Sequence, residues 1–175
     1  MKTATLIVVA GIAAVTAGGQ PKTTEAKTAK AETAAGKIRD AYSPAGKIFA
    51  QKLVEQAMDK HPDLLVFVFH VTPPGKTTNI IIASNIGRIG KEADEDDLRV
   101  INTGKPNLEV NTYGDHFEVE MALKDGTGKT IGALATVFPY KAGDDQEKLH
   151  QKGEAIRADM EKQIPTKAKL FEITK

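Results

Sequence analysis

The chain has 175 residues, 41% of them hydrophobic, which is enough for one domain with a buried core. Its 24 lysines and arginines nearly balance its 23 aspartates and glutamates, so no basic field is available to attract nucleic acid. The absence of cysteine excludes disulfides, thiolate metal sites, a cysteine nucleophile and a lipid anchor on cysteine.

The N-terminus has the pattern of a secretory signal. Lys2 supplies a positive charge, Leu6–Val15 an apolar stretch, and Val15–Ala17 the small residues that a signal peptidase cuts after. The apolar stretch is shorter than the roughly 20 residues of a membrane-spanning helix. We therefore expect a signal peptide over residues 1–17 and a periplasmic or secreted protein. The alternative is an uncleaved signal that tethers the chain to a membrane.

Residues 18–37 consist mostly of Ala, Thr, Lys, Glu and Gly, which cannot bury enough apolar surface to fold, so we expect a flexible low-complexity linker. A folded domain is expected over residues 38–175. Ser43 and Pro44 are typical of a helix start. Apolar residues then recur at helical spacing as far as Lys60, namely Ala45, Ile48, Phe49, Leu53, Ala57 and Met58.

Two strands and a short helix are predicted next. The continuous apolar run Leu64–Thr72 and the run Asn79–Ser84 flank a Pro-Pro-Gly turn and should pair as a hairpin. In Asn85–Gly104 the acids Glu92–Asp97 precede a helical pattern, and acids at a helix N-terminus complement its exposed amides. These acids lack the alternation and the glycine of a calcium loop, so no metal site is predicted.

The best-defined pattern is a hairpin over Phe117–Tyr140. Its first half alternates apolar and polar residues, which predicts a half-buried strand that exposes Glu118 and Glu120 as solubilising charges. Asp125–Gly128 supplies a tight reversal. The second half is apolar on both faces, which predicts a central strand. A short strand, Asn107–Thr112, should precede this hairpin.

The C-terminal region has the pattern of a long charged helix, Asp144–Ile164, followed by a tail in which Leu170, Phe171 and Ile173 dock on the domain. Tight reversals between the strands favour an antiparallel sheet. The predicted fold class is therefore α+β, with a five-stranded antiparallel sheet, an N-terminal helix, a short inter-strand helix and a long C-terminal helix.

Two stretches carry a resemblance to a known family: IIASNIGRIGKEADEDDLRVINTGKP and FEVEMALKDGTGKTIGALATVFPY. With the order of the elements, they resemble the Cache group of extracytoplasmic sensor domains, relatives of the PAS fold, over roughly residues 43–163. The resemblance implies a small-molecule pocket between the sheet and the segment that joins the second and third strands. Because the sequence shows no output module, we expect a single-domain form that acts through a separate membrane sensor or kinase partner.

Seven residues are candidate ligand contacts. In a glycine-flanked loop, the Arg88 guanidinium could clamp a carboxylate in bidentate fashion, or it could form a salt bridge with the nearby acids. Two tyrosines offer flat surfaces with a polar tip. A His70/His116 metal pair lacks an identifiable third ligand, and no serine or acid is spaced to form a catalytic triad with His70. The candidates are His70, Ser84, Asn85, Arg88, Tyr113, His116 and Tyr140.

No phosphate loop, zinc spacing, nucleophile elbow or dinucleotide motif is present, so neither a cofactor nor an enzymatic activity is predicted. The sequence favours an exported domain that binds a small organic ligand, with a carboxylate as one option, and that could form a homodimer. Two alternatives stay open: a ligand-free structural or protein-interaction module of the cell envelope, and a small envelope enzyme that uses His70 or His116.

Overall fold

The computed structural model describes residues 46–174. The predicted signal peptide, the linker and the helix start at Ser43 and Pro44 lie outside these residues. No helix within the described part is long and apolar enough to span a membrane. The elements, in order, are α2 (Phe49–Lys60), β1 (Val66–Val71), β2 (Ile80–Ser84), α3 (Glu95–Thr103), β3 (Asn107–Val110), β4 (His116–Lys124), β5 (Thr130–Pro139), α4 (Gln146–Glu161) and the 3-10 helix η1 (Lys167–Phe171).

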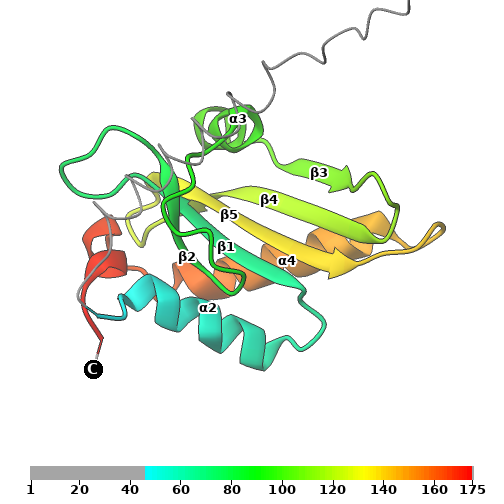
Figure 1. Cartoon of the computed structure of the whole chain (residues 1–175), viewed down its shortest axis with the longest axis horizontal. Coiled ribbons are helices and arrows are strands. Elements are labelled where there is room, and N and C mark those ends of the chain that lie inside the picture. The colour runs from blue at the N-terminus through cyan, green and yellow to red at the C-terminus, as the bar shows by residue number, and fades with distance from the viewer. Residues whose placement is uncertain (1–45, 175) are drawn as a thin grey trace, which may run out of the picture.

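The five strands form one antiparallel sheet in the order β2-β1-β5-β4-β3 (Figure 1). This confirms the predicted α+β class. It also confirms that the last strand of the sequence, β5, is the central one. A strand that is apolar on both faces is stable only where both faces are covered, and the middle of a sheet provides that cover.

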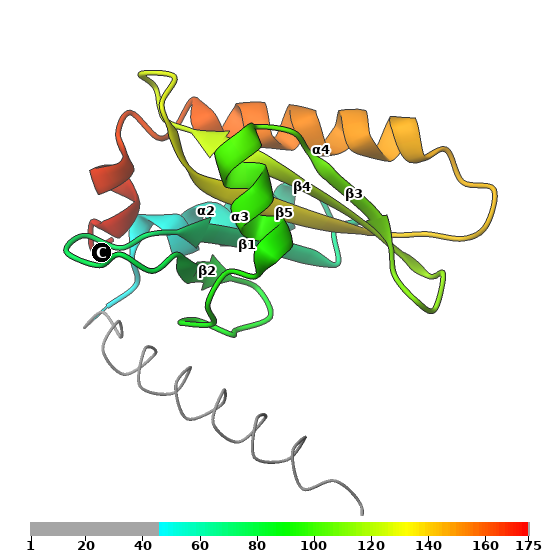
Figure 2. The same ribbon diagram turned by 90° about the horizontal axis from the view of Figure 1, so that it is seen from above.

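The helices lie on opposite faces of the sheet (Figure 2). α2 and α4 pack against the face that carries the aromatic side chains, where Leu53 and Ile156 join Phe117 and Phe138 in the main core. α3 crosses the other face. There Val100 packs on small alanines of β4 and β5. Because α3 is short, it covers this second face only in part.

The N-terminal helix starts later than predicted. Ile48 is extended and forms the N-cap of α2, so the expectation that it belongs to the helix is wrong. The reason is a contact with the C-terminal tail. Ile48 pairs with Ile173 in an isolated β-bridge, and the Phe49 N–H donates to the Glu172 carbonyl at 2.8 Å. Docking of the tail is confirmed by Leu170, which is fully buried.

Gly132 sets the distance between β1 and β5 at the position of His70. A Cβ atom on Gly132 would collide with the His70 carbonyl oxygen and would lie 2.8 Å from Val71 Cγ2. We therefore expect Gly132→Ala to lower the free energy of unfolding by about 3 kcal/mol or more, at the upper end of overpacking effects. Chemical denaturation followed by circular dichroism measures this loss.

Gly75→Ala is the matched control for that substitution. Gly75 has a φ of 72°, but no atom lies within 4 Å of the position that a Cβ would take there, so only its left-handed backbone should matter. We expect a loss of about 1–2 kcal/mol at this position. Equal losses at both positions would contradict the collision argument.

Candidate functional site

A cleft of about 340 Å³ opens on the face that α3 covers only in part. Apolar side chains of β1 and β5 form its floor, and charged side chains of the β2–α3 segment, β3 and β4 form its walls. It occupies the place that the Cache resemblance implied, between the sheet and the segment after β2. The lining residues are Val66, Val68, His70, Ile81, Ile86, Arg88, Lys91, Asp94, Asp97, Glu109, Asn111, His116, Glu118, Ala135 and Val137.

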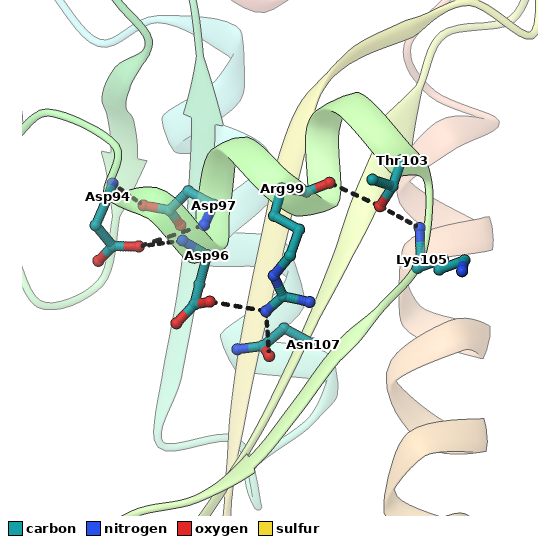
Figure 3. Close-up of polar contacts among 7 residues, drawn as sticks. All are labelled: Asp94, Asp96, Asp97, Arg99, Thr103, Lys105 and Asn107. Carbon is teal, nitrogen blue, oxygen red and sulfur yellow. Dashed lines mark hydrogen bonds and ion pairs between the residues drawn. The ribbon is translucent and has the colours of Figure 1, made fainter.

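The start of α3 is fixed by a reciprocal capping box (Figure 3). Asp94 Oδ1 accepts hydrogen bonds from the Asp96 and Asp97 N–H groups at 3.2 and 3.3 Å. Asp97 Oδ2 in turn accepts from the Asp94 N–H at 2.8 Å. This confirms that acids of the sequence cluster cap a helix N-terminus. It also holds the Asp97 side chain in one orientation.

Arg99 ties the same helix to the edge of the sheet. Its guanidinium donates to Asp96 Oδ1 at 2.7 Å and to Asn107 Oδ1 at 2.8 Å (Figure 3). Asn107 begins β3, so the bond pair links α3 to the strand next to β4. These two hydrogen bonds thus attach α3, which forms one wall of the cleft, to the sheet that forms its floor.

Four ionisable side chains meet beneath α3, and we call them the inner polar cluster: His70 of β1, Asp97 of α3, and Glu118 and Glu120 of β4. His70 and Asp97 are each 6% exposed and Glu120 is 3% exposed. His70 Nδ1 lies 3.3 Å from Asp97 Oδ2. His70, Asp97 and Glu118 line the cleft, and Glu120 lies close enough to Asp97 for the two carboxyl groups to interact.

The four side chains of the inner polar cluster can approach one another because the central strand, β5, carries small side chains at these positions. In the sheet register, Ala133 of β5 pairs with His70 and Ala135 of β5 pairs with Glu120. Because the side chains of these alanines are single methyl groups, the Asp97 side chain can extend from α3 into the space above β5, between β1 and β4. Asp97 therefore reaches both His70 and Glu120.

Burial sets the protonation states of the cluster. Burial, a hydrogen bond to Asp97 and the charges of neighbouring acids raise the pKa of Glu120 to about 10. Burial likewise raises the pKa of Glu118, with further contributions from Asp97 and Glu109. Burial lowers the pKa of His70, although the Asp97 charge acts in the opposite direction. Near pH 7, Glu120 is therefore protonated and His70 is neutral.

Two atoms of the cluster have no hydrogen-bond partner among residues 46–174: His70 Nδ1 and Glu120 Oε1. The 3.3 Å approach of His70 Nδ1 to Asp97 is an ion-pair distance that lacks hydrogen-bond alignment. Buried polar atoms are nearly always paired, and an unpaired one costs about 1–3 kcal/mol. His70 lines the cleft whereas Glu120 does not, so the unused hydrogen-bonding capacity at the inner end of the cleft is that of His70 Nδ1.

Two expectations about these residues were wrong. Glu120 is buried and Glu118 is half-buried, so they are not solvated charges on an open face. An acid does reach His70, namely Asp97. Alternation in a strand shows that two residues share a face, but it does not show which helix will cover that face.

Three of the seven predicted ligand contacts line the cleft: His70, Arg88 and His116. Arg88 makes no ion pair with any residue of the described part, so of the two alternatives for Arg88 the salt bridge to the nearby acids is wrong. Those acids have other partners, since Lys91 lies 3.8 Å from Asp94 and Arg99 pairs with Asp96. Arg88 also has a φ of 62°, a strained value for a residue with a Cβ.

The other four predicted contacts lie elsewhere. Ser84 Oγ accepts from the Ile86 N–H, and Asn85 bonds the Phe67 N–H and the Leu65 carbonyl, so both fix the end of the β1–β2 hairpin. Tyr113 is 88% exposed in the turn after β3. Tyr140 packs on Phe117 on the opposite face of the sheet. Six polar residues that line the cleft have no sequence pattern that predicts a ligand contact, namely Lys91, Asp94, Asp97, Glu109, Asn111 and Glu118.

Residues 46–174 contain no group of three or more His, Asp or Glu side chains arranged to hold a metal ion.

No protein-family model and no curated protein matches the chain. Solved structures do resemble it. The nlh2 GAF domain of A. aeolicus, in an inactive state, aligns with 14% identity and a TM-score of 0.52 over 77% of this chain and 95% of that one. A protein described as a GAF sensor from Burkholderia vietnamiensis aligns with 14% identity and a TM-score of 0.48, over 82% and 91% of the two chains. A type II free methionine-R-sulfoxide reductase from Thermoplasma acidophilum aligns with 14% identity and a TM-score of 0.40, over 78% and 97%.

The likeness to the A. aeolicus domain concerns the fold. Residues 46–174 have a GAF-like fold, with an open antiparallel sheet and three α-helices. The finer resemblance to Cache domains stays a prediction. At this level of identity, the function has to be argued from the cleft itself.

The protonated state of Glu120 predicts an unusual pH dependence of stability. The carboxyl has its ordinary pKa of 4.5 in the unfolded chain and about 10 in the folded one, so the folded state binds more protons between these values. The free energy of unfolding should therefore fall as the pH rises from 7 to 9, by at most about 1.4 kcal/mol per pH unit. The raised pKa of Glu118 acts in the same direction at pH values just above 4.5. The lowered pKa of His70 acts in the opposite direction, but only below about 6.5.

Urea denaturation at several pH values between 7 and 9 measures this slope. Glu120→Gln should flatten it and should stabilise the domain at pH 9. Glu95→Gln, on the exposed start of α3, should leave the slope unchanged. A flat profile for the unmodified protein would contradict burial of a protonated carboxyl.

Proposed function

We propose that this chain is an exported, sensor-type domain that binds a small organic ligand in the cleft and acts through a separate partner protein. The observation that carries the proposal is the cleft: an apolar floor, a guanidinium without an ion-pair partner among residues 46–174, and the unpartnered, buried His70 Nδ1 at its inner end. Its volume of about 340 Å³ suits a small metabolite, since ligand pockets typically measure about 300–1,000 Å³.

The fold is consistent with this proposal but does not carry it. Domains with GAF/PAS-like folds are generally small-molecule-binding sensors. A fold hosts many functions, however, and only the chemistry of the site can favour one of them. Export is supported by the pattern of residues 1–17 alone.

The two alternatives account less well for the cleft. A ligand-free structural or interaction module should have a filled interior, whereas this interior has a polar-lined opening. An envelope enzyme would gain a general base from the His70–Asp97 contact. The residues that line the cleft nevertheless include no hydroxyl or thiol nucleophile.

The first feature that we propose for the ligand is a carboxylate group, which would bind Arg88. Both Arg88 and Lys91 come from the loop between β2 and α3 and line the cleft, and a guanidinium binds a carboxylate through two parallel hydrogen bonds. Because it has no ion-pair partner in the described part of the chain, Arg88 loses no existing ion pair when the ligand binds.

A thermal-shift screen of residues 37–175 against organic acids and amino acids tests this function. A ligand at 100 times its dissociation constant stabilises the folded state by about 2.7 kcal/mol, which is a shift of several degrees. Arg88→Gln should abolish the shift, whereas Lys76→Gln in the exposed turn after β1 should preserve it. No shift across the panel would contradict ligand binding. A shift that survives Arg88→Gln would contradict the role of Arg88.

The strained backbone of Arg88 gives a second prediction. Arg88→Gly should raise the stability of the ligand-free domain by up to about 1 kcal/mol, because glycine adopts positive φ without a Cβ penalty. Arg88→Gln keeps the Cβ and should leave this stability unchanged. Chemical denaturation compares the two variants, and both should lose carboxylate binding. If Arg88→Gly destabilises the domain, then other contacts of the side chain outweigh the strain.

A further inference from the structure

The inner polar cluster has features that a carboxylate ligand alone does not use. His70 Nδ1 and Glu120 Oε1 belong to side chains that are more than nine-tenths buried, and neither atom has a hydrogen-bond partner in residues 46–174. The neutral imidazole nitrogen and the carboxyl oxygen are both able to accept a hydrogen bond. A ligand group that carries N–H donors would supply what the cluster lacks.

The charges around the cluster favour a positive group. Asp94 and Asp97 of α3, Glu109 of β3 and Glu118 of β4 bring carboxyl groups to this side of the cleft. The cationic residues that line the cleft are Arg88 and Lys91, from the loop before α3, with the titratable His116 at the start of β4. Lys91 approaches Asp94 at 3.8 Å, and no lysine or arginine of the described residues pairs with Asp97, Glu118 or Glu120. The charge of Lys91 also acts on His70 and Glu118, so the carboxyl groups around the cluster outnumber the cations but are not separate from them.

We propose that the inner polar cluster binds a protonated amine of the ligand, with His70, Asp97 and Glu118 as acceptors, and that Glu120 releases its proton to solvent when the amine binds. The proposal rests on the proposed function and adds the chemical class of the ligand, a small organic molecule with an ammonium group. The same molecule can also carry a carboxylate that binds Arg88.

The proton release follows from electrostatics. Glu120 keeps its proton because burial and neighbouring acids disfavour its charged form. An ammonium group held by Asp97 and Glu118 places a positive charge beside the same carboxyl, and such a charge favours ionisation. Ionised Glu120 then has a positive partner. One proton leaves the protein for each amine that enters, so total charge is conserved.

Two isomeric cations provide a sharp test on the folded domain. n-Butylammonium and tetramethylammonium have the same formula and charge, but only the first has N–H donors. Isothermal titration calorimetry at pH 8 should show that n-butylammonium binds about tenfold more tightly or better, the gain expected for hydrogen bonds to charged groups. Titrations in phosphate and in HEPES, whose ionisation enthalpies differ and which carry no primary ammonium group, should report the release of close to one proton.

Three variants separate the roles within the cluster. Glu118→Gln should weaken n-butylammonium binding by about tenfold. Glu120→Gln should retain binding but remove the proton release, because glutamine has no proton to lose. Glu95→Gln on the exposed face of α3 should change neither. The number of protons that the unmodified protein releases on binding tests the proposal even if a variant fails to fold.

The outcomes also distinguish this inference from the function on which it rests. Equal affinity for the two cations, or equal heats in the two buffers, would overturn the inference and would indicate that only water occupies the cluster. If organic acids nevertheless stabilise the domain through Arg88, the proposed function survives without the amine site. If neither cations nor acids bind, both proposals fail.

Discussion

The site depends on one steric constraint, the small size of Ala133 and Ala135 on the central strand. These residues lie between His70 on β1 and Glu120 on β4, and they allow the Asp97 side chain to reach both. The capping box at the start of α3 then fixes the position of Asp97. Larger residues at the two alanine positions would hold α3 away from the sheet. The inner polar cluster would separate into unconnected buried groups, which cost more than paired ones.

The same arrangement explains why a cleft exists at all. α3 sits close to β4 and β5, where Val100 packs on Ala122 and Ala133, and it is tied to β3 through Arg99 and Asn107. It has only nine residues and leaves the β1 side of this face open. The apolar residues there, such as Val66 and Val137, become a floor for a ligand. On the opposite face two longer helices fill the equivalent space, and the core is continuous.

Local patterns predicted the fold well because each strand and helix has a signal within a few residues. The period of two in β4, the apolar β5 and the glycine turn between them defined the central hairpin. The start of α2 could not be predicted, because Ile48 pairs with Ile173 at the far end of the chain. The site was predicted only in part for the same reason. Arg88 is recognisable from its glycine neighbours, whereas the contact of Asp97 with His70 depends on how α3 packs on the sheet.

The energetic cost of the inner polar cluster is itself informative. Replacing buried ionic groups with well-packed apolar residues often stabilises a protein by about 1–4 kcal/mol. The opposite face of this sheet shows that the fold accepts such an apolar core. Asp97 caps α3, but the carboxyl groups of Glu118 and Glu120 and the imidazole with its unpartnered nitrogen add nothing that the fold requires. A destabilised polar group beside a cleft is what a binding site needs, because a ligand that supplies the missing partners recovers that energy on binding.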